Sequence, residues 1–471
     1  MTLMKGSVDT GRPRGVPPEG RMPRVLVVTY DFPPSMAMGA QACAQIARYL
    51  PLYRWEPVVL TVEERYGESI GACSGQQQFP WHVVRTSVIP HPTVLYRSLK
   101  SRLGWGDRRT AGNDGNDGET ESGGTLRRWV LSMFLIGDAY TGWFLPAVVA
   151  GLKAIRRDGV EHLFSSGPPW TAHLVGLTLS WVSGRPWLAH FRDPWNQGEQ
   201  WQCKPVSALS RWIDGVLERM IVKRAAFVVC VTDQHTDMFR AMYGDVPSNK
   251  FVTVPNGFDE AEWEWAEPAK EVASPGRGDR FVISYAGQLY QARNPFPLFR
   301  ALRALIEAGY VDAKRVQIEL IGWCEMAEGR RVEEMAAECG IGDCVNLRGP
   351  RSRAETLQKL AGSDLLLLLA EGLTVQIPGK TYEYLRTGRP ILALTSEGAV
   401  ADLLRRAGGS WVVDPVDEKG MVAALREAYG LWEKGLPLPS ADQAIVSGFD
   451  RRVLAGRIAE LFERSVHSVP A

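Results

Sequence analysis

Several features that define common protein classes are missing from this 471-residue chain. Its charge is balanced, with 54 Lys and Arg against 53 Asp and Glu, which argues against a nucleic-acid binder because such proteins carry a strongly basic domain. The seven cysteines are scattered and include no Cys-x-x-Cys pair, so neither a zinc site nor a disulfide framework is predicted. We therefore expect reduced thiols and a cytoplasmic protein.

The chain also lacks a long, uninterrupted apolar run. The longest apolar tract, residues 129–152, is interrupted by Asp138, Pro146 and glycines, which makes it a poor membrane span. The first 22 residues contain arginines and prolines but no apolar core of signal-peptide length. Because no Asp-x-Asp triplet occurs, we predict no metal site.

What the chain does contain is a repeated pattern of short apolar runs with helical stretches between them. The runs have no polar alternate face, which is typical of strands buried in a parallel sheet. They form two successive series, so the sequence predicts an α/β protein with two doubly wound, Rossmann-like domains that face each other across a cleft. The first series is 24–29, 57–62, 82–87, 162–167, 186–193, 227–232 and 251–257, and the second is 281–287, 316–322, 345–350, 364–370, 390–395 and 410–415.

Composition divides the chain around these two series. Residues 1–22 are predicted to be a disordered tail and residues 23–265 the first domain, with a polar, flexible insertion at 104–124. The Pro- and Gly-containing residues 266–280 are expected to be the hinge. The second domain is predicted over 281–445. The remaining residues, 446–471, include an amphipathic stretch that we expect to close the fold as a helix crossing back onto the first domain.

Two loops that follow strands carry groups suited to a phosphate. The first strand leads through a loop with Gly39 into a helix, whose N-terminus offers free N–H groups and the positive end of a dipole. In the second domain Arg293 lies in the loop after the first strand, where its planar fork suits a diphosphate. A packing turn and a solvated arginine are the simpler interpretations of these two features.

The segment that follows the strand at 364–370 is the most informative. Pro378 and Gly379 open a helix, so the N–H groups near Gly379 and Lys380 can receive a phosphate. Glu383 follows one turn later, where its carboxylate can accept hydrogen bonds from two ribose hydroxyls. A surface Lys–Glu pair is the simpler interpretation, but it does not explain why these groups occur together at the end of a strand.

Six motifs occur in order between about Arg24 and Leu461. In sequence and order they resemble a subgroup of the GT-B-fold glycosyltransferases of the family-four kind, which use nucleotide-activated sugars. The motifs are Tyr-Asp-Phe-Pro-Pro (30–34), Ser-Gly-Pro-Pro-Trp-Thr-Ala-His (166–173), Phe-Arg-Asp-Pro-Trp (191–195), Pro-Asn-Gly-Phe-Asp (255–259), Tyr-Ala-Gly-Gln-Leu-Tyr (285–290) and Pro-Gly-Lys-Thr-Tyr-Glu-Tyr-Leu (378–385).

The resemblance implies a role for each matched position. On the donor side Glu383 is expected to bind the ribose and Arg293 the diphosphate, with a catalytic role for Arg293 as it stabilises the leaving group. On the acceptor side His173 and Asp193 are expected to be catalytic and to lie in the cleft. Further donor-binding positions are Gly39, Gln288, Ile377, Pro378, Gly379 and Lys380, and further acceptor-side positions are Trp170, Arg192 and Trp195.

The chain also departs from the family pattern at three places. Met36 and Ala37 stand where the phosphate loop usually has two glycines, and Gln288 stands where an arginine is frequent. Val375 replaces the first Glu of the usual Glu-x₇-Glu pair, so the usual contact to the sugar 3- and 4-hydroxyls is missing.

The predicted function is the transfer of a sugar from a nucleoside diphosphate donor to an acceptor hydroxyl, with retention of configuration and without a metal or other cofactor. Two alternatives stay open. A nucleotide-sugar epimerase shares the two-domain fold, although no acid/base motif for it is present. A non-catalytic subunit that binds sugar nucleotides is favoured by the missing glycines and the missing Glu.

The acceptor is not identified by the sequence; a small molecule, a lipid-linked molecule and a glycan all remain candidates. Residues 96–109 carry five basic groups and one acidic group, and residues 126–135 are also basic and apolar. Such segments suit peripheral contact with the inner face of an anionic membrane, although a solvated loop and a buried helix are the simpler interpretation. Of 16 tryptophans, 13 lie at or before Trp265, and we expect Trp170 and Trp195 to line the acceptor side of the cleft.

Overall fold

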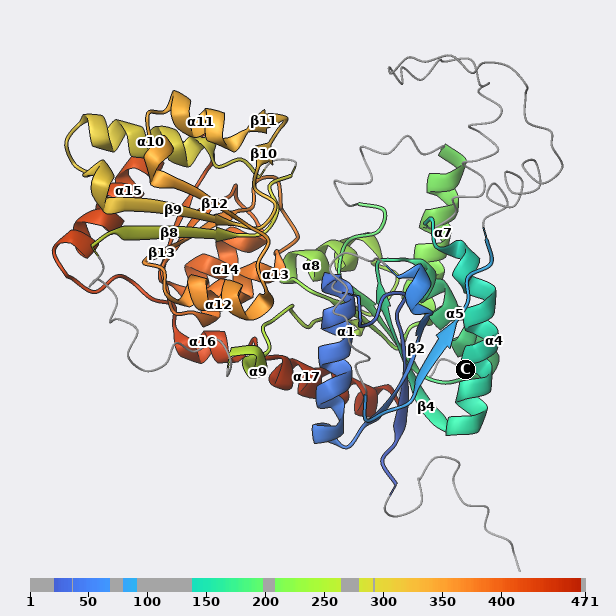
Figure 1. The fold of residues 1–471 in the computed structure, drawn as a ribbon. Helices are drawn as coiled ribbons and strands as arrows, with labels where there is room; N and C mark the ends of the chain where they lie inside the picture. Colours follow the sequence, from blue (N-terminus) through green and yellow to red (C-terminus); the bar gives the residue numbers. More distant parts are fainter. Residues whose placement is uncertain are drawn as a thin grey trace, which may run out of the picture.

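The computed structural model describes residues 21–35, 37–67, 79–90, 138–197, 208–263, 279–290 and 293–466. Within these residues the chain forms two parallel sheets of seven and six strands, each flanked by helices (Figure 1). The predicted α/β class with two Rossmann-like domains is confirmed, and each of the thirteen predicted apolar runs contains a strand. All of the insertion at 104–124 and most of the tail and the hinge lie outside the described residues.

The first sheet has the strand order β3-β2-β1-β4-β5-β6-β7, so the order reverses between β1 and β4. Its central strand β1 pairs in parallel with β2 and β4, with Val27 level with Val59 and Phe164. The strands are β1 (Arg24–Val28), β2 (Glu56–Val62), β3 (Val83–Thr86), β4 (Val160–Gly167), β5 (Trp187–Phe191), β6 (Phe227–Cys230) and β7 (Phe251–Thr253).

Alternation along β1 directs apolar side chains to both faces of this sheet. Val25 and Val27 pack on the face covered by α1 (Met38–Tyr49) and α17 (Arg451–Ser465), and Leu26 and Val28 pack on the opposite face. The opposite face is covered by α4 (Phe144–Asp158), α5 (Thr171–Ser183), α7 (Ala208–Arg224) and α8 (Asp233–Met242).

Helix α17 joins the last part of the chain to the first. Asp450 caps its N-terminus by accepting a hydrogen bond from the Arg452 N–H at 2.8 Å. Leu454, Ile458 and Phe462 recur at helical spacing and are buried against β1, β2 and α1. One face of the first sheet is therefore completed by the end of the chain, which crosses back from the second domain (Figure 1).

The second sheet has the order β12-β9-β8-β13-β14-β15 and reverses between β8 and β13. Its strands are β8 (Phe281–Ala286), β9 (Val316–Ile321), β12 (Val345–Gly349), β13 (Leu365–Leu369), β14 (Ile391–Leu394) and β15 (Ser410–Val413). One face carries α10 (Phe296–Glu307), α11 (Val332–Glu338) and α15 (Glu418–Glu433). The other carries α9 (Glu260–Trp263), α12 (Arg353–Ala361), α13 (Gly379–Arg386), α14 (Ala399–Ala407) and α16 (Gln443–Ser447).

Two further observations complete the fold. A two-stranded hairpin, β10 (Met326–Ala327) with β11 (Arg330–Arg331), was not predicted, because it contains no apolar run. No described helix combines the length and the apolar character that crossing a bilayer requires.

The first domain encloses histidines that the fold keeps uncharged. His162, His173 and His235 are 4%, 0% and 0% exposed, and burial lowers the pKa of His162 and His235 to about 4 and of His173 to about 3. The unfolded chain takes up these protons near pH 6.5. Between the lowered pKa of each folded histidine and pH 6.5, the unfolded chain binds more protons than the folded chain. Lowering the pH through this range therefore destabilises the folded state.

We predict that the free energy of unfolding falls as the pH drops below about 6.5, by up to about 2 kcal/mol per buried histidine at pH 5. Urea denaturation at pH 7.5, 6 and 5 measures this slope. The variant His235→Gln should show a shallower slope than the parent chain. Equal unfolding free energies at pH 7.5 and 5 would contradict the prediction.

Candidate active site

The loops that follow the strands at the two reversal points meet between the domains. Ligands of doubly wound sheets bind at such points, outside the carboxyl ends of the strands. The first turn of α1 reaches that of α13, where a Cβ added at Gly379 would lie 3.1 Å from the Met38 sulfur. The Thr232 hydroxyl, at the start of α8, donates a hydrogen bond to the Val375 carbonyl at 2.6 Å. The predicted loops of Gly39 and Gly379 are therefore brought together.

Two cations lie close to each other at the beginning of α13. The Lys380 ammonium donates to the Ala286 carbonyl at 2.6 Å and to the Tyr285 hydroxyl at 3.1 Å. The Arg293 guanidinium stacks on the Tyr290 ring, 4.1 Å from its centre. Burial lowers the pKa of Lys380 to about 7, and the positive charge of Arg293 adds to this effect. An anion bound here would offset both the desolvation of the Lys380 ammonium and its repulsion by Arg293.

Glu383 lies on the same helix and is held by an arginine that the sequence analysis did not select. Arg353, the first residue of α12, donates to both carboxylate oxygens of Glu383, at 2.6 and 3.0 Å. Its guanidinium also donates to Glu262 at 2.9 and 3.1 Å. Arg353 is thirty positions from Glu383 and belongs to another βα unit, so no local pattern signals the pair. The Ser352-x-x-Glu355 capping box does mark where its helix begins.

The same network reaches the first domain. Glu262, in α9, accepts a hydrogen bond from the Gln45 amide of α1 at 3.0 Å. Arg386, one turn after Glu383 on α13, pairs with Glu260 of α9 and lies over the Trp263 ring. Helix α9 is thus held between the two domains by charged and polar contacts.

Arg192 occupies the first-domain side of the site. Its guanidinium donates to the Pro168 carbonyl and lies directly against Gly39, so that a side chain added at that position would have to displace the guanidinium. A cation at the N-terminus of α1 faces the positive end of the helix dipole, which is unfavourable unless an anion is bound. The predicted Gly39 and Arg192 are in contact, and their positions suit a bound phosphate.

Asp193 makes a direct contact across the cleft. Its carboxylate accepts a hydrogen bond from the Gln376 amide, two residues before Pro378, at 2.6 Å. Burial raises the pKa of Asp193. The turn that holds it is fixed by Glu218 of α7, whose carboxylate accepts hydrogen bonds from the Asn196 backbone and side chain and from the Tyr243 hydroxyl.

His173, Trp170 and Trp195 do not face the cleft as expected. Trp195 is fully buried and Trp170 is 5% exposed, and their rings stack 5.2 Å apart. The His173 ring lies among the same aromatic residues, 4.4 Å from Phe191, with its Nδ1 2.8 Å from the Ser165 hydroxyl. Burial of the large apolar area of these rings beneath α5 is more favourable than their exposure to water. The expectation that these aromatic side chains line the cleft was therefore wrong.

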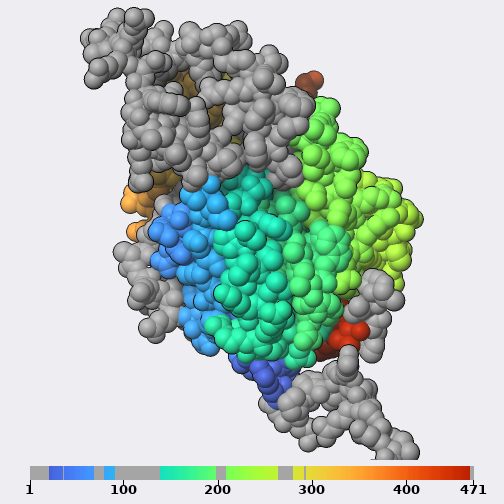
Figure 2. Space-filling model, turned by 90° about the vertical axis from the view of Figure 1, so that its right-hand side faces the viewer, coloured from blue at the N-terminus to red at the C-terminus, as the bar shows by residue number. Residues whose placement is uncertain are grey.

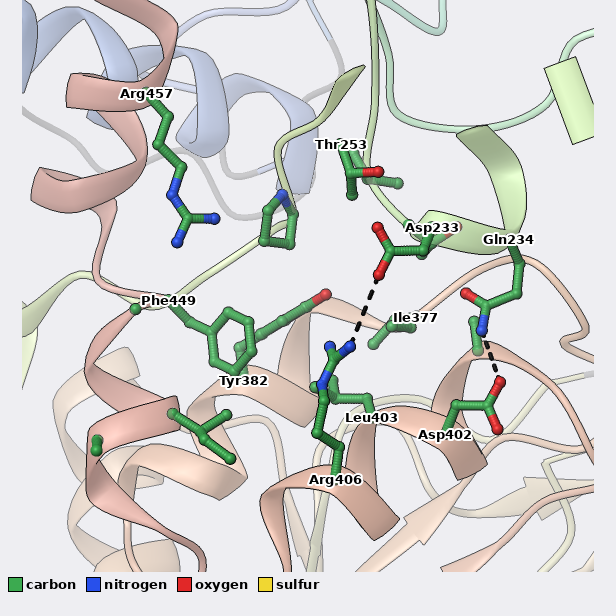
Figure 3. A pocket seen from close by; sticks show the side chains of 17 residues that line it. Asp233, Gln234, Thr253, Ile377, Tyr382, Asp402, Leu403, Arg406, Phe449 and Arg457 are labelled. Atoms are coloured by element: carbon green, nitrogen blue, oxygen red, sulfur yellow. Dashed lines mark hydrogen bonds and ion pairs between the residues drawn. The ribbon is translucent and has the colours of Figure 1, made fainter. Parts of the chain in front are cut away.

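The remaining predicted positions surround the same loops. Gln288 is exposed, and its carbonyl accepts the Tyr285 hydroxyl. Ile377 and Pro378 are partly exposed at the start of α13. Ile377 also lines a cavity of about 370 Å³ between the domains, on the side of α8, α14 and α17 (Figure 3). There Asp233 pairs with Arg406 at 3.7 Å and Gln234 donates to Asp402 at 2.7 Å, so the cavity is crossed by contacts between the two domains.

Solved structures with the same pair of domains define the fold as GT-B. The chain is similar to sucrose-phosphate synthase from Thermosynechococcus elongatus, with a TM-score of 0.60 and 14% identity over 95% of this chain and 100% of that one. It is also similar to HepE from Anabaena in complex with UDP, with a TM-score of 0.59 and 15% identity over 94% of this chain and 100% of that one.

Sequence comparison adds the family to the fold. The model described as Glycosyltransferase Family 4 matches residues 110–262, and the model described as Glycosyl transferases group 1 matches residues 280–430. Together they cover more than half of the chain, and the chain belongs to the family-4 glycosyltransferases. A curated relative, D-inositol 3-phosphate glycosyltransferase 1 of Catenulispora acidiphila, is 25% identical over 216 residues, which are 44% of this chain and 50% of the relative. The chain thus spans about half the length of that relative.

We predict that this site binds pyrophosphate more tightly when Lys380 is protonated. With a pKa of about 7, Lys380 is mostly charged at pH 6.5 and mostly neutral at pH 9, and affinity should fall about tenfold or more between them. Calorimetric titration at both pH values measures the change, and Lys380→Gln serves as the control because it removes this titration. An equal pH dependence in the parent chain and in the variant would contradict the assignment.

Proposed function

We propose that the chain transfers a sugar from a nucleoside diphosphate donor to an acceptor hydroxyl, with retention of anomeric configuration and without a metal ion. The observation that carries this proposal is the pair of neighbouring cations, Lys380 and Arg293, at the N-terminus of α13. They form a positive site one helical turn from the carboxylate of Glu383, which is what a diphosphate attached to a ribose requires.

The charge distribution suits the departure of the diphosphate. Cleavage of the sugar–phosphate bond places negative charge on the leaving phosphate while the sugar becomes cationic. Lys380, Arg293 and the N–H groups near Gly379 would stabilise that negative charge without moving, because the fold holds them in place. Arg192 would add a further positive charge from the first domain.

Glu383 is proposed to bind the ribose, with Arg353 holding its carboxylate in place. The two guanidinium bonds leave other lone pairs of the carboxylate to accept ribose hydroxyls. A uridine nucleotide is the proposed donor type, since HepE from Anabaena has been solved with UDP and with UDP-glucose.

Asp193 is the proposed catalytic group on the acceptor side. It comes from the carboxyl end of β5 and meets Gln376 across the cleft, so it can orient an acceptor hydroxyl beside the donor. His173 is enclosed and uncharged, and we propose that it supports the turn around Gly167 through packing. We also propose a cytoplasmic location, in keeping with the five described cysteines, all of which are free and buried.

A non-catalytic sugar-nucleotide-binding subunit is the second candidate, favoured by Val375 at the position of the missing Glu. A panel of nucleotide sugars with mixed acceptors distinguishes the two. Release of nucleoside diphosphate that depends on an acceptor supports transfer, whereas binding without release supports the subunit. Isomerised sugar nucleotide as the product would indicate an epimerase instead.

We predict that Glu383→Gln weakens binding of UDP by about tenfold or more, because a charged acceptor of hydrogen bonds is lost. Calorimetric titration measures the affinity, and thermal unfolding checks that the variant folds. The matched control is Glu397→Gln, which alters an exposed glutamate that is paired with Arg405 in the second domain. Unchanged affinity in a folded Glu383→Gln variant would refute the ribose assignment.

We predict that turnover persists after treatment with EDTA, since cationic side chains stabilise the leaving group. The product of the reaction should carry the same anomeric configuration as the donor, as read by proton NMR. Activity that is abolished by EDTA and restored by Mg²⁺ would contradict metal independence, and an inverted product would contradict retention.

A further inference from the structure

The first part of helix α7, from Leu209 to Glu218, has its polarity reversed relative to a normal surface helix, whereas its last turns bury Ile221 and Val222 in the usual way. Its inward face carries Ser210, Asp214 and Glu218, which are 1%, 0% and 0% exposed. Its outward face carries Leu209, Trp212 and Val216, which are 38%, 66% and 39% exposed. These three residues follow the i, i+3, i+7 spacing that places side chains on one stripe of a helix.

The inward polar groups have a structural reason to be there. Glu218 accepts hydrogen bonds from Asn196, Gln197 and Tyr243 and so anchors the turn that follows Asp193. This explains the polar interior but not the apolar exterior. An outward Trp, Leu and Val on one stripe is what a contact surface requires.

Helix α5, which packs beside α7, and α4, which packs beside α5, carry further exposed apolar side chains. Helices α4, α5 and α7 form one layer on the first domain, the face seen in Figure 2. Of the 21 large apolar side chains that are exposed among the described residues, seven belong to these three helices. They are Leu145, Val149, Trp181, Val182, Leu209, Trp212 and Val216.

The charges exposed on this layer have one sign. The three helices contain three acidic residues: Asp214 and Glu218 are buried, and Asp158 is paired with Arg157 at 3.0 Å. Their exposed basic residues are Lys153, Arg156, Arg157, Arg211, Arg219 and Lys223. Asp245, after α8, pairs with Arg219 and Lys223, so Arg211 is the cation next to Trp212 that has no ion-pair partner among the described residues.

We propose that the outer layer of α4, α5 and α7 docks onto the surface of an anionic lipid bilayer, with Trp212 as its central anchor. Tryptophan suits the boundary between headgroups and acyl chains because its ring is apolar and its N–H is polar. Exposed cations next to apolar side chains complement anionic headgroups, and neither interaction alone holds a protein firmly at a membrane. A protein partner would need matching acidic groups, whereas an anionic bilayer supplies them everywhere.

The position of α7 makes this contact useful for the reaction. The helix follows β5 and the turn of Asp193, so its N-terminal half lies at the carboxyl edge of the first sheet, on the proposed acceptor side. A bilayer on this layer would present hydroxyl-bearing headgroups to that side of the cleft. The docking itself does not depend on the proposed donor chemistry and can be tested without turnover.

The test is sedimentation of the full chain with vesicles of 70% phosphatidylcholine and 30% phosphatidylglycerol. The double variant Trp212→Ser with Val216→Ser should lower the partition coefficient by about tenfold or more, and Arg211→Glu should lower it by a smaller factor that vanishes in 0.5 M NaCl. The matched control is Trp323→Ser, which removes a tryptophan 58% exposed on the second domain and should bind as the parent chain does. Thermal unfolding of each variant verifies that it is folded.

Each outcome decides the proposal. Binding that requires phosphatidylglycerol, and that the α7 variants lose while Trp323→Ser retains it, supports docking through this layer. No binding of the parent chain, or equal binding of the α7 variants, overturns it. Concentration-dependent dimers in sedimentation velocity that disappear in the Trp212 and Val216 double variant would also overturn it, because the stripe would then serve a second copy of the chain.

Discussion

The site depends on one constraint of parallel sheets, which is that the strand order must reverse somewhere if helices are to cover both faces. In this chain the reversals fall between β1 and β4 and between β8 and β13. At each reversal two neighbouring loops leave the sheet in opposite directions and expose the ends of the strands. Gly39 and Arg192 surround the first opening, and Arg293, Lys380 and Glu383 surround the second, so groups far apart in sequence can act on one ligand.

Within the opening, electrostatics sets the state of each group. Lys380 and Arg293 repel each other, while Glu383 shares its charge with Arg353. Through Glu262 and Gln45 the same carboxylate is linked to α1. A nucleotide bound at Glu383 as proposed would contact a network that already spans both domains, so occupancy of the site would be physically coupled to the approach of the two domains.

Much of the fold could be predicted because buried parallel strands leave a strong signal. The five leucines of β13 and the valines of β1 are apolar on both faces and cannot be mistaken for a surface strand. The hairpin β10–β11 has no such signal, since two of its four residues are exposed arginines. Arg353 was missed because its partner Glu383 belongs to another unit, and contacts between units leave no trace in local spacing.

Two aromatic residues were assigned to the cleft although the structure buries them. Trp170 and Trp195 lie inside motifs at the ends of strands, so they were expected to line the cleft. Sequence position fixed the end of the sheet at which they lie but not the depth of their side chains, which depends on how α5 packs over β5. Trp212 was not singled out either. Which side of α7 faces outward depends on the elements packed around it, and these are known only from the structure.

Helix α17 has a consequence for the synthesis of this protein. The first sheet is formed from residues that leave the ribosome early, yet Val25, Val27 and Phe164 need Leu454, Ile458 and Phe462 to cover them. At ordinary elongation rates roughly 200 further residues take on the order of ten seconds or more to emerge after β7. During that interval the part of this face that α17 covers in the folded protein stays apolar and open, which makes it a surface that chaperones would be expected to protect until α17 has emerged.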